Sequence, residues 1–145
     1  MKEKVKTKSI KQIVVFKATP HELYEMLMDS KKHRAFSGET AKISKKEGGK
    51  VSAYGGWVSA KNLTLKPDRL IIQAWRGGNW PEGHYSKAVF LFTQTKIGTK
   101  LTFSQTKVPA DKAKHIAKGW HDSYWNKMKA ALDGVHKVSS KKMSR

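Results

Sequence analysis

Residues 110 to 132 constrain the fold more than any other part of the sequence, because they have the pattern of one long helix with a single apolar face. Apolar residues recur there at spacings of three and four, which is the period of a buried helical stripe. The stripe consists of Ala113, Ile116, Ala117, Trp120, Tyr124, Met128, Ala131 and Leu132. A helix of this length is about 35 Å long and must bury its stripe against a second layer.

Two glycines bear on where this helix ends and how regular it is. Gly134 is typical of the position just after a helix end, so the helix is expected to stop there. Gly119 lies inside the helical pattern, where glycine costs about 1 kcal/mol relative to alanine. It predicts either a close approach of the sheet backbone beside Trp120 or a local kink.

The second layer is predicted to be a sheet, because much of the remaining chain has an apolar period of two. Strands are predicted at residues 10–16, 41–44, 50–54, 62–65, 70–75, 85–94 and 100–106. Turn residues such as Gly48, Pro67 and Gly98 separate several of them, so neighbouring strands are expected to pair in antiparallel order. The pair Gly55-Gly56 interrupts the pattern and predicts a bulge or a sharp bend.

Two short helices are predicted after the first strand. Thr19, Pro20 and Glu22 have the spacing of a capping box with proline at the first helical position. Ser30 is expected to cap a second helix that ends near Gly38. The order of strand, two short helices, about six strands and one long helix predicts a two-layer α+β domain.

This order places one domain over residues 10–136. Residues 1–9 alternate lysine with small or polar residues, and they form either a basic extension or the start of the first strand. Residues 137–145 are basic and polar and are predicted to be a disordered tail.

Residues 75 to 86, with the sequence WRGGNWPEGHYS, form a loop between two predicted strands. A tryptophan in a loop needs a place to bury its ring. Trp80 therefore either folds back onto the domain or covers the mouth of a cavity. Arg76 and Glu82 flank the loop and are predicted to anchor it by pairing across it.

The loop and the strand before it resemble the family of the activator of the heat-shock-protein-90 ATPase, within the START-like, helix-grip superfamily. Further similar pieces occur in the same order: FKATPHELYEMLMD, FSGETAKIS, GGKVSAYGGWV, NLTLKPDRLIIQAWR, TKLTFSQTKVP and GWHDSYWNKMKAAL. The resemblance covers about residues 10 to 134. It implies a curved antiparallel sheet of six or seven strands that wraps around the C-terminal helix, often with a cavity between them.

Large apolar side chains would line such a cavity, or else fill it as an ordinary core. The candidate lining residues are Phe36, Trp75, Trp80, Phe90, Phe92, Phe103, Trp120, Tyr124 and Met128. Our first functional hypothesis is therefore a non-enzymatic domain that binds a small hydrophobic or amphipathic ligand between the helix and the sheet.

The alternative hypothesis is a co-chaperone-like protein that binds the heat-shock-protein-90 chaperone and modulates its ATPase. The formal net charge of +19 suits an acidic partner. Whole eukaryotic members of the family carry a further N-terminal domain that contributes to chaperone binding, and residue 10 already begins the helix-grip domain. No residue is assigned to activation for this reason.

Other functions are disfavoured by composition. The chain has no cysteine, and His115 and His121 are six apart, so a metal site is not expected. The excess charge is mostly lysine, whereas sequence-specific nucleic-acid readers tend to use arginine. Catalysis by a START-like enzyme would need a general acid or base in the cavity, and none is recognisable; His84 is read as a surface residue. No cofactor and no membrane span are predicted, and a cytoplasmic location is expected.

Overall fold

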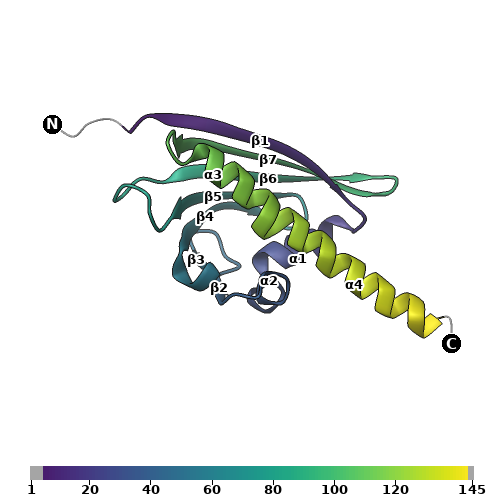
Figure 1. Cartoon of the computed structure of the whole chain (residues 1–145). Helices are drawn as coiled ribbons and strands as arrows, with labels where there is room; N and C mark the ends of the chain where they lie inside the picture. The colour runs from purple at the N-terminus through teal and green to yellow at the C-terminus, as the bar shows by residue number, and fades with distance from the viewer. Residues whose placement is uncertain (1–4, 144–145) are drawn as a thin grey trace.

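The computed structural model describes residues 5 to 143, and the side chains of residues 5 to 134. Its sheet has seven antiparallel strands in the order β1-β7-β6-β5-β4-β3-β2 (Figure 1). The strands are β1 (Thr7–Phe16), β2 (Ala41–Ile43), β3 (Lys50–Ala53), β4 (Val58–Lys66), β5 (Leu70–Gly77), β6 (Ser86–Thr95) and β7 (Gly98–Pro109). The first strand begins at Thr7, so residues 7 to 9 extend it.

The helices lie on one face of this sheet. Two short helices, α1 (Pro20–Met28) and α2 (Ser30–Ser37), follow the first strand as predicted, and a single 3-10 turn, η1 (Tyr54–Gly56), bends the chain between β3 and β4. The long C-terminal helix crosses the sheet diagonally in Figure 1. It consists of α3 (Ala113–Gly119), a π-helical turn η2 (Trp120–Trp125) and α4 (Asn126–Met143). The predicted α+β helix-grip fold is therefore confirmed.

The long helix differs from the prediction at its end. It continues through Gly134 to Met143, so Gly134 is not its C-terminal cap. The side chains of residues 135 to 145 lie outside the described part. The domain boundaries at residues 10 and 136 and the tail that follows stay predictions.

Capping residues determine where the two short helices begin and end. Thr19 and Glu22 form the predicted capping box at the start of α1. Asp29, rather than Ser30, caps α2: its side chain accepts a hydrogen bond from the backbone N–H of Lys32 at 3.0 Å. The Ser30 hydroxyl instead accepts from the backbone N–H of Ile43 at 2.9 Å, which joins this helix to β2. Gly38 ends α2 with a left-handed φ of 76°, as its position predicted.

The π-helical turn decides which side chains the long helix presents to the sheet. A π-helical turn is wider than an α-helical one and is frequent at functional sites. Here it brings Trp120, Tyr124 and Trp125 into the core together, and all three are buried. The indole N–H of Trp125 donates to Gln12 Oε1 at 2.7 Å, and Gln12 Nε2 donates to the carbonyl of Ala117 at 2.9 Å. These two bonds hold the helix against β1.

Candidate functional site

An open pocket of about 300 Å³ lies between the first half of the long helix and the strands on the β4–β5 side of the sheet. Its walls come from the η1 turn, the start of β4, β5 and the helix. It is lined by Tyr54, Trp57, Val58, Trp75, His115, Ile116, Gly119, Trp120, Ser123 and Tyr124. The lining is mostly apolar, and Trp57 at its edge is 38% exposed. Such a pocket has the chemistry of a site for a small apolar molecule.

Gly119 helps to keep this pocket open. A Cβ added there would meet no atom within 4 Å, so the glycine faces empty space rather than the sheet backbone. The predicted close approach beside Trp120 is therefore wrong. The irregularity is instead the π-helical turn, which starts at the next residue.

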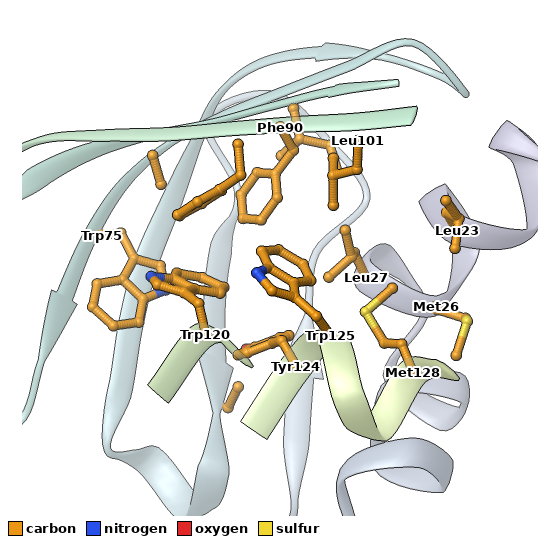
Figure 2. Packing of buried hydrophobic residues seen from close by; sticks show 14 of the residues in the cluster. Leu23, Met26, Leu27, Trp75, Phe90, Leu101, Trp120, Tyr124, Trp125 and Met128 are labelled. Atoms are coloured by element: carbon orange, nitrogen blue, oxygen red, sulfur yellow. The ribbon is translucent and has the colours of Figure 1, made fainter. Parts of the chain in front are cut away.

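The floor of the pocket is a packed aromatic cluster with Trp120 at its centre. Its ring centroid lies 4.4 Å from that of Phe103, 4.6 Å from Tyr124 and 5.4 Å from Trp75. Figure 2 shows Trp75, Trp120 and Tyr124 between the long helix and the sheet, with Phe90 above them on the sheet side. Beneath them a void of about 20 Å³ remains, enough for about one water molecule. The space between helix and sheet is therefore mostly a packed core, and the pocket of about 300 Å³ lies at one side of it.

The predicted lining residues divide accordingly. Trp75, Trp120 and Tyr124 line the open pocket, and Phe90 borders the small void beneath it. The others border neither space and belong to the buried core: Phe36, Trp80, Phe92, Phe103 and Met128. These five are packed in the core, which is the alternative stated in the sequence analysis, and a part for them in ligand binding stays a prediction.

The tryptophan loop folds back onto the domain. Trp80 is only 4% exposed and packs against Trp75 at 5.4 Å, so it does not cover the pocket mouth. Arg76 ties the loop by donating to the backbone carbonyls of Trp80 and Pro81 at 2.9 and 3.0 Å. The predicted pair with Glu82 is not formed among the described residues, because Glu82 is exposed and the guanidinium is already occupied by the two carbonyls.

A buried histidine beside the pocket was missed by the sequence analysis. His33 on α2 is 2% exposed, and its Nε2 lies 3.0 Å from the hydroxyl of Tyr124. Burial lowers the pKa of His33 to about 4. Burial also raises the pKa of Tyr124 and brings that of Tyr54 to about 12. All three side chains are therefore neutral at pH 7. The available signal was the spacing of His33 and Phe36, which places both on one helical face.

A chain of polar contacts supports the pocket floor from the sheet side. The indole N–H of Trp120 donates to Gln105 Oε1 at 2.8 Å, and Gln105 Nε2 donates to the hydroxyl of Ser86 at 2.9 Å. The Ser86 hydroxyl in turn donates to the backbone carbonyl of Trp75 at 2.8 Å. These contacts fix the orientation of the Trp120 ring and join it to the backbone of Trp75.

Comparison with known proteins identifies the family of this chain. The family model described as "Activator of Hsp90 ATPase homolog 1-like protein" matches residues 17–133. The chain belongs to this Hsp90-activator family. This match confirms the family resemblance found in the sequence.

Individual relatives agree with this family membership. The chain is 32% identical over 137 residues to the "Activator of 90 kDa heat shock protein ATPase homolog" of Dictyostelium discoideum, covering 94% of this chain and 36% of that protein. It is 29% identical over 126 residues to the human activator homolog 1, covering 87% of this chain and 37% of that one. The chain thus spans little more than a third of the length of these curated relatives.

Solved structures share the fold of this family member. The crystal structure described as an HSP90 activator from Plasmodium falciparum has a TM-score of 0.78 at 20% identity, covering 88% of this chain and 96% of that one. A protein from Mesorhizobium loti gives a TM-score of 0.72 at 16% identity, covering 87% and 97%.

Among the side chains of residues 5 to 134, no group of three or more His, Cys, Asp or Glu is placed to hold a metal ion. Within residues 5 to 143, no helix is both long enough and apolar enough to cross a membrane.

Proposed function

We propose that this chain is a non-catalytic domain that binds an Hsp90-type chaperone and modulates its ATPase in the cytoplasm. Membership of the Hsp90-activator family over residues 17–133 carries the proposal. The Dictyostelium and human relatives are named as activators of the ATPase of another protein. Because the chain matches only about a third of each, the activity of the whole relatives comes to it as a proposal.

The chemistry of the pocket supports binding rather than catalysis. None of the described residues that line it is Asp, Glu, Lys or Arg, and its one histidine, His115, is solvent-exposed rather than enclosed in the pocket. General acid–base catalysis needs a titratable group whose pKa lies near the working pH. The pKa of His33 beside the pocket is about 4 and that of Tyr54 about 12, so neither is suited to proton transfer at pH 7.

The proposal is tested by the ATPase rate of an Hsp90 chaperone with increasing amounts of this chain, at about 0.05 M salt, where charge attraction is weakly screened. We expect a saturable change in the rate. The chain alone should release no phosphate from ATP. An unchanged ATPase rate at saturating concentration, together with no measurable binding, would contradict the proposal.

We propose as a second candidate function that the open pocket binds a small apolar ligand. This second proposal is supported by the empty space beside Gly119 and by the tryptophan rings at the floor and edge of the pocket. A volume of about 300 Å³ lies at the lower end of the range for small-molecule sites.

The substitution Gly119→Leu is expected to fill the pocket and abolish ligand binding. Leucine favours helix by almost 1 kcal/mol over glycine, so the variant should stay folded. The matched control is Gly134→Leu, because a Cβ at Gly134 also meets nothing within 4 Å and this residue does not line the pocket. Tryptophan fluorescence with a panel of lipids, sterols and planar aromatics measures the effect. A ligand that binds the Gly119→Leu variant as well as it binds the wild type would exclude this pocket.

A further inference from the structure

The seven strands of the described sheet contain no aspartate and no glutamate. They carry only basic charged side chains: Lys8, Lys11, Lys42, Lys50, Lys61, Lys66, Arg76, Lys87, Lys100 and Lys107. The carboxylates of the described chain lie in the helices and connecting segments instead. The strands therefore contribute ten of the nineteen net positive charges.

Lys50, Lys61 and Lys87 point away from the long helix. Along the strands, buried positions face the helix and exposed positions face the opposite side, so the alternation places these basic side chains on the outer face. Figure 1 shows the helices on the other face. The outer face of the sheet thus carries basic side chains and no carboxylate in the described structure.

Two neighbouring rows of paired residues cross this outer face. The first row consists of Lys42, Ser52, Ser59 and Arg76 on β2 to β5. The second row consists of Lys50, Lys61, Ala74 and Lys87 on β3 to β6. The small side chains in the middle of the rows leave a shallow groove of about 700 Å³, with lysines at its sides.

One pair in this groove is unfavourable for the isolated domain. Lys50 and Lys61 lie directly opposite each other on antiparallel strands, and like charges in such pairs destabilise a sheet. No carboxylate of the described residues forms an ion pair with either lysine. An anionic group placed between the two ammonium groups would relieve their repulsion.

We propose that this groove and the apolar strip beside it bind an acidic, amphipathic peptide segment of a partner protein. The strip lies on the same face, four residues along β5 and β6 from the second row. It contains Leu91, which is 43% exposed and pairs with Leu70, and, across Thr102 of β7, Ile13 of β1, which is 58% exposed. Carboxylates of the partner lie over Lys50 and Lys61, and its apolar side chains lie over the strip.

The chemistry of this face favours a peptide over a nucleic acid. Single-stranded nucleic acid is bound by aromatic side chains on which bases stack, in combination with a basic groove. The outward-facing positions of the strands carry no aromatic ring. Tyr85 at the edge of the groove already has the Arg76 guanidinium 5.8 Å from its ring centroid. Exposed aliphatic side chains, in contrast, match apolar side chains of a peptide.

The test measures binding of a labelled peptide of about ten residues with a Glu-rich first half and a Leu-rich second half, long enough to reach from the lysines to the strip when extended. Fluorescence anisotropy is recorded at about 0.05 M salt for the wild type and two double variants. Lys50→Gln with Lys61→Gln removes the opposed pair. Lys96→Gln with Lys114→Gln is the matched control, because it removes the same charge from exposed positions outside the strands.

We expect the Lys50→Gln, Lys61→Gln variant to bind the peptide about tenfold more weakly, and the control variant less than about twofold more weakly. The same variant should melt at a slightly higher temperature than the wild type, since the like-charge pair is gone. A peptide with Gln in place of Glu should not bind. Equal weakening by both variants would overturn the proposal, as would tighter binding of a thymidine oligonucleotide or of anionic phosphatidylserine vesicles at the same lysines.

The inference goes beyond the proposed function, because it concerns any partner segment of this chemistry. Peptide binding that is unaffected by the Lys50→Gln, Lys61→Gln pair, with chaperone binding intact, would overturn the inference and leave the proposed function standing. Peptide binding without chaperone binding would overturn the proposed function alone.

Discussion

The substitution Trp120→Ala is expected to lower the free energy of unfolding by about 3 to 5 kcal/mol, the usual cost of removing a large buried ring. Trp120 is 3% exposed and contacts Phe103, Tyr124 and Trp75 at the centre of the aromatic cluster. Its loss also leaves Gln105 Oε1 without the N–H that it accepts from. Urea unfolding followed by circular dichroism measures the change.

Two further variants separate the causes of this effect. Trp120→Phe keeps most of the ring volume and removes the donor to Gln105, so it should cost about 1 to 3 kcal/mol. Trp57→Ala removes the same side-chain type from the pocket edge, where the ring is 38% exposed, and should cost clearly less than Trp120→Ala. Equal losses for Trp57→Ala and Trp120→Ala would contradict the central place given to Trp120.

Lowering the pH from 7.5 to 4 is expected to remove about 3 kcal/mol of stability through His33 alone. The pKa of His33 is about 4 in the folded protein, against 6.5 as its ordinary value. Between these two values the unfolded chain binds more protons than the folded one. The contribution is therefore fully present above pH 6.5 and is lost as the pH falls towards 4.

The variant His33→Gln isolates this contribution. Glutamine does not titrate, and its amide can take the place of His33 Nε2 beside the Tyr124 hydroxyl. Carboxylates such as Asp29 titrate in both proteins, so the difference between their unfolding free energies from pH 7.5 to 4 reports His33. The exposed His21 provides the matched control as His21→Gln. A wild type and a His33→Gln variant with the same pH dependence would show that His33 is not buried in its neutral form.

Periodicity predicted the fold well, because the order of elements follows from local patterns. The capping box at Thr19, the left-handed Gly38 and the alternation in β5 and β6 are signals that neighbouring residues carry. The long helix was found from its stripe. The predicted C-terminal end of the helix was wrong. Glycine is common just after a helix end, which pointed to Gly134, whereas the helix of the structure continues past this residue.

The candidate site was predicted less well, because it depends on contacts between distant segments. Trp80 and Phe103 are large apolar residues of the kind that line cavities. Only the tertiary structure shows that each packs against another tryptophan ring in the core. His33 looked like one polar residue among lysines, although it reaches Tyr124 ninety-one positions later in the chain. The absence of carboxylates from the strands was visible in the sequence. Its meaning emerged only when the register brought Lys50 and Lys61 face to face.

The most direct test of the account is an amide NMR titration of the labelled chain with an unlabelled Hsp90 chaperone at about 0.05 M salt. Binding to so large a partner should attenuate amide signals, and we expect the strongest losses along β3, β4 and β5. Signals that remain unchanged at chaperone concentrations on the order of 100 μM would contradict the claim that this family member is an Hsp90-binding domain.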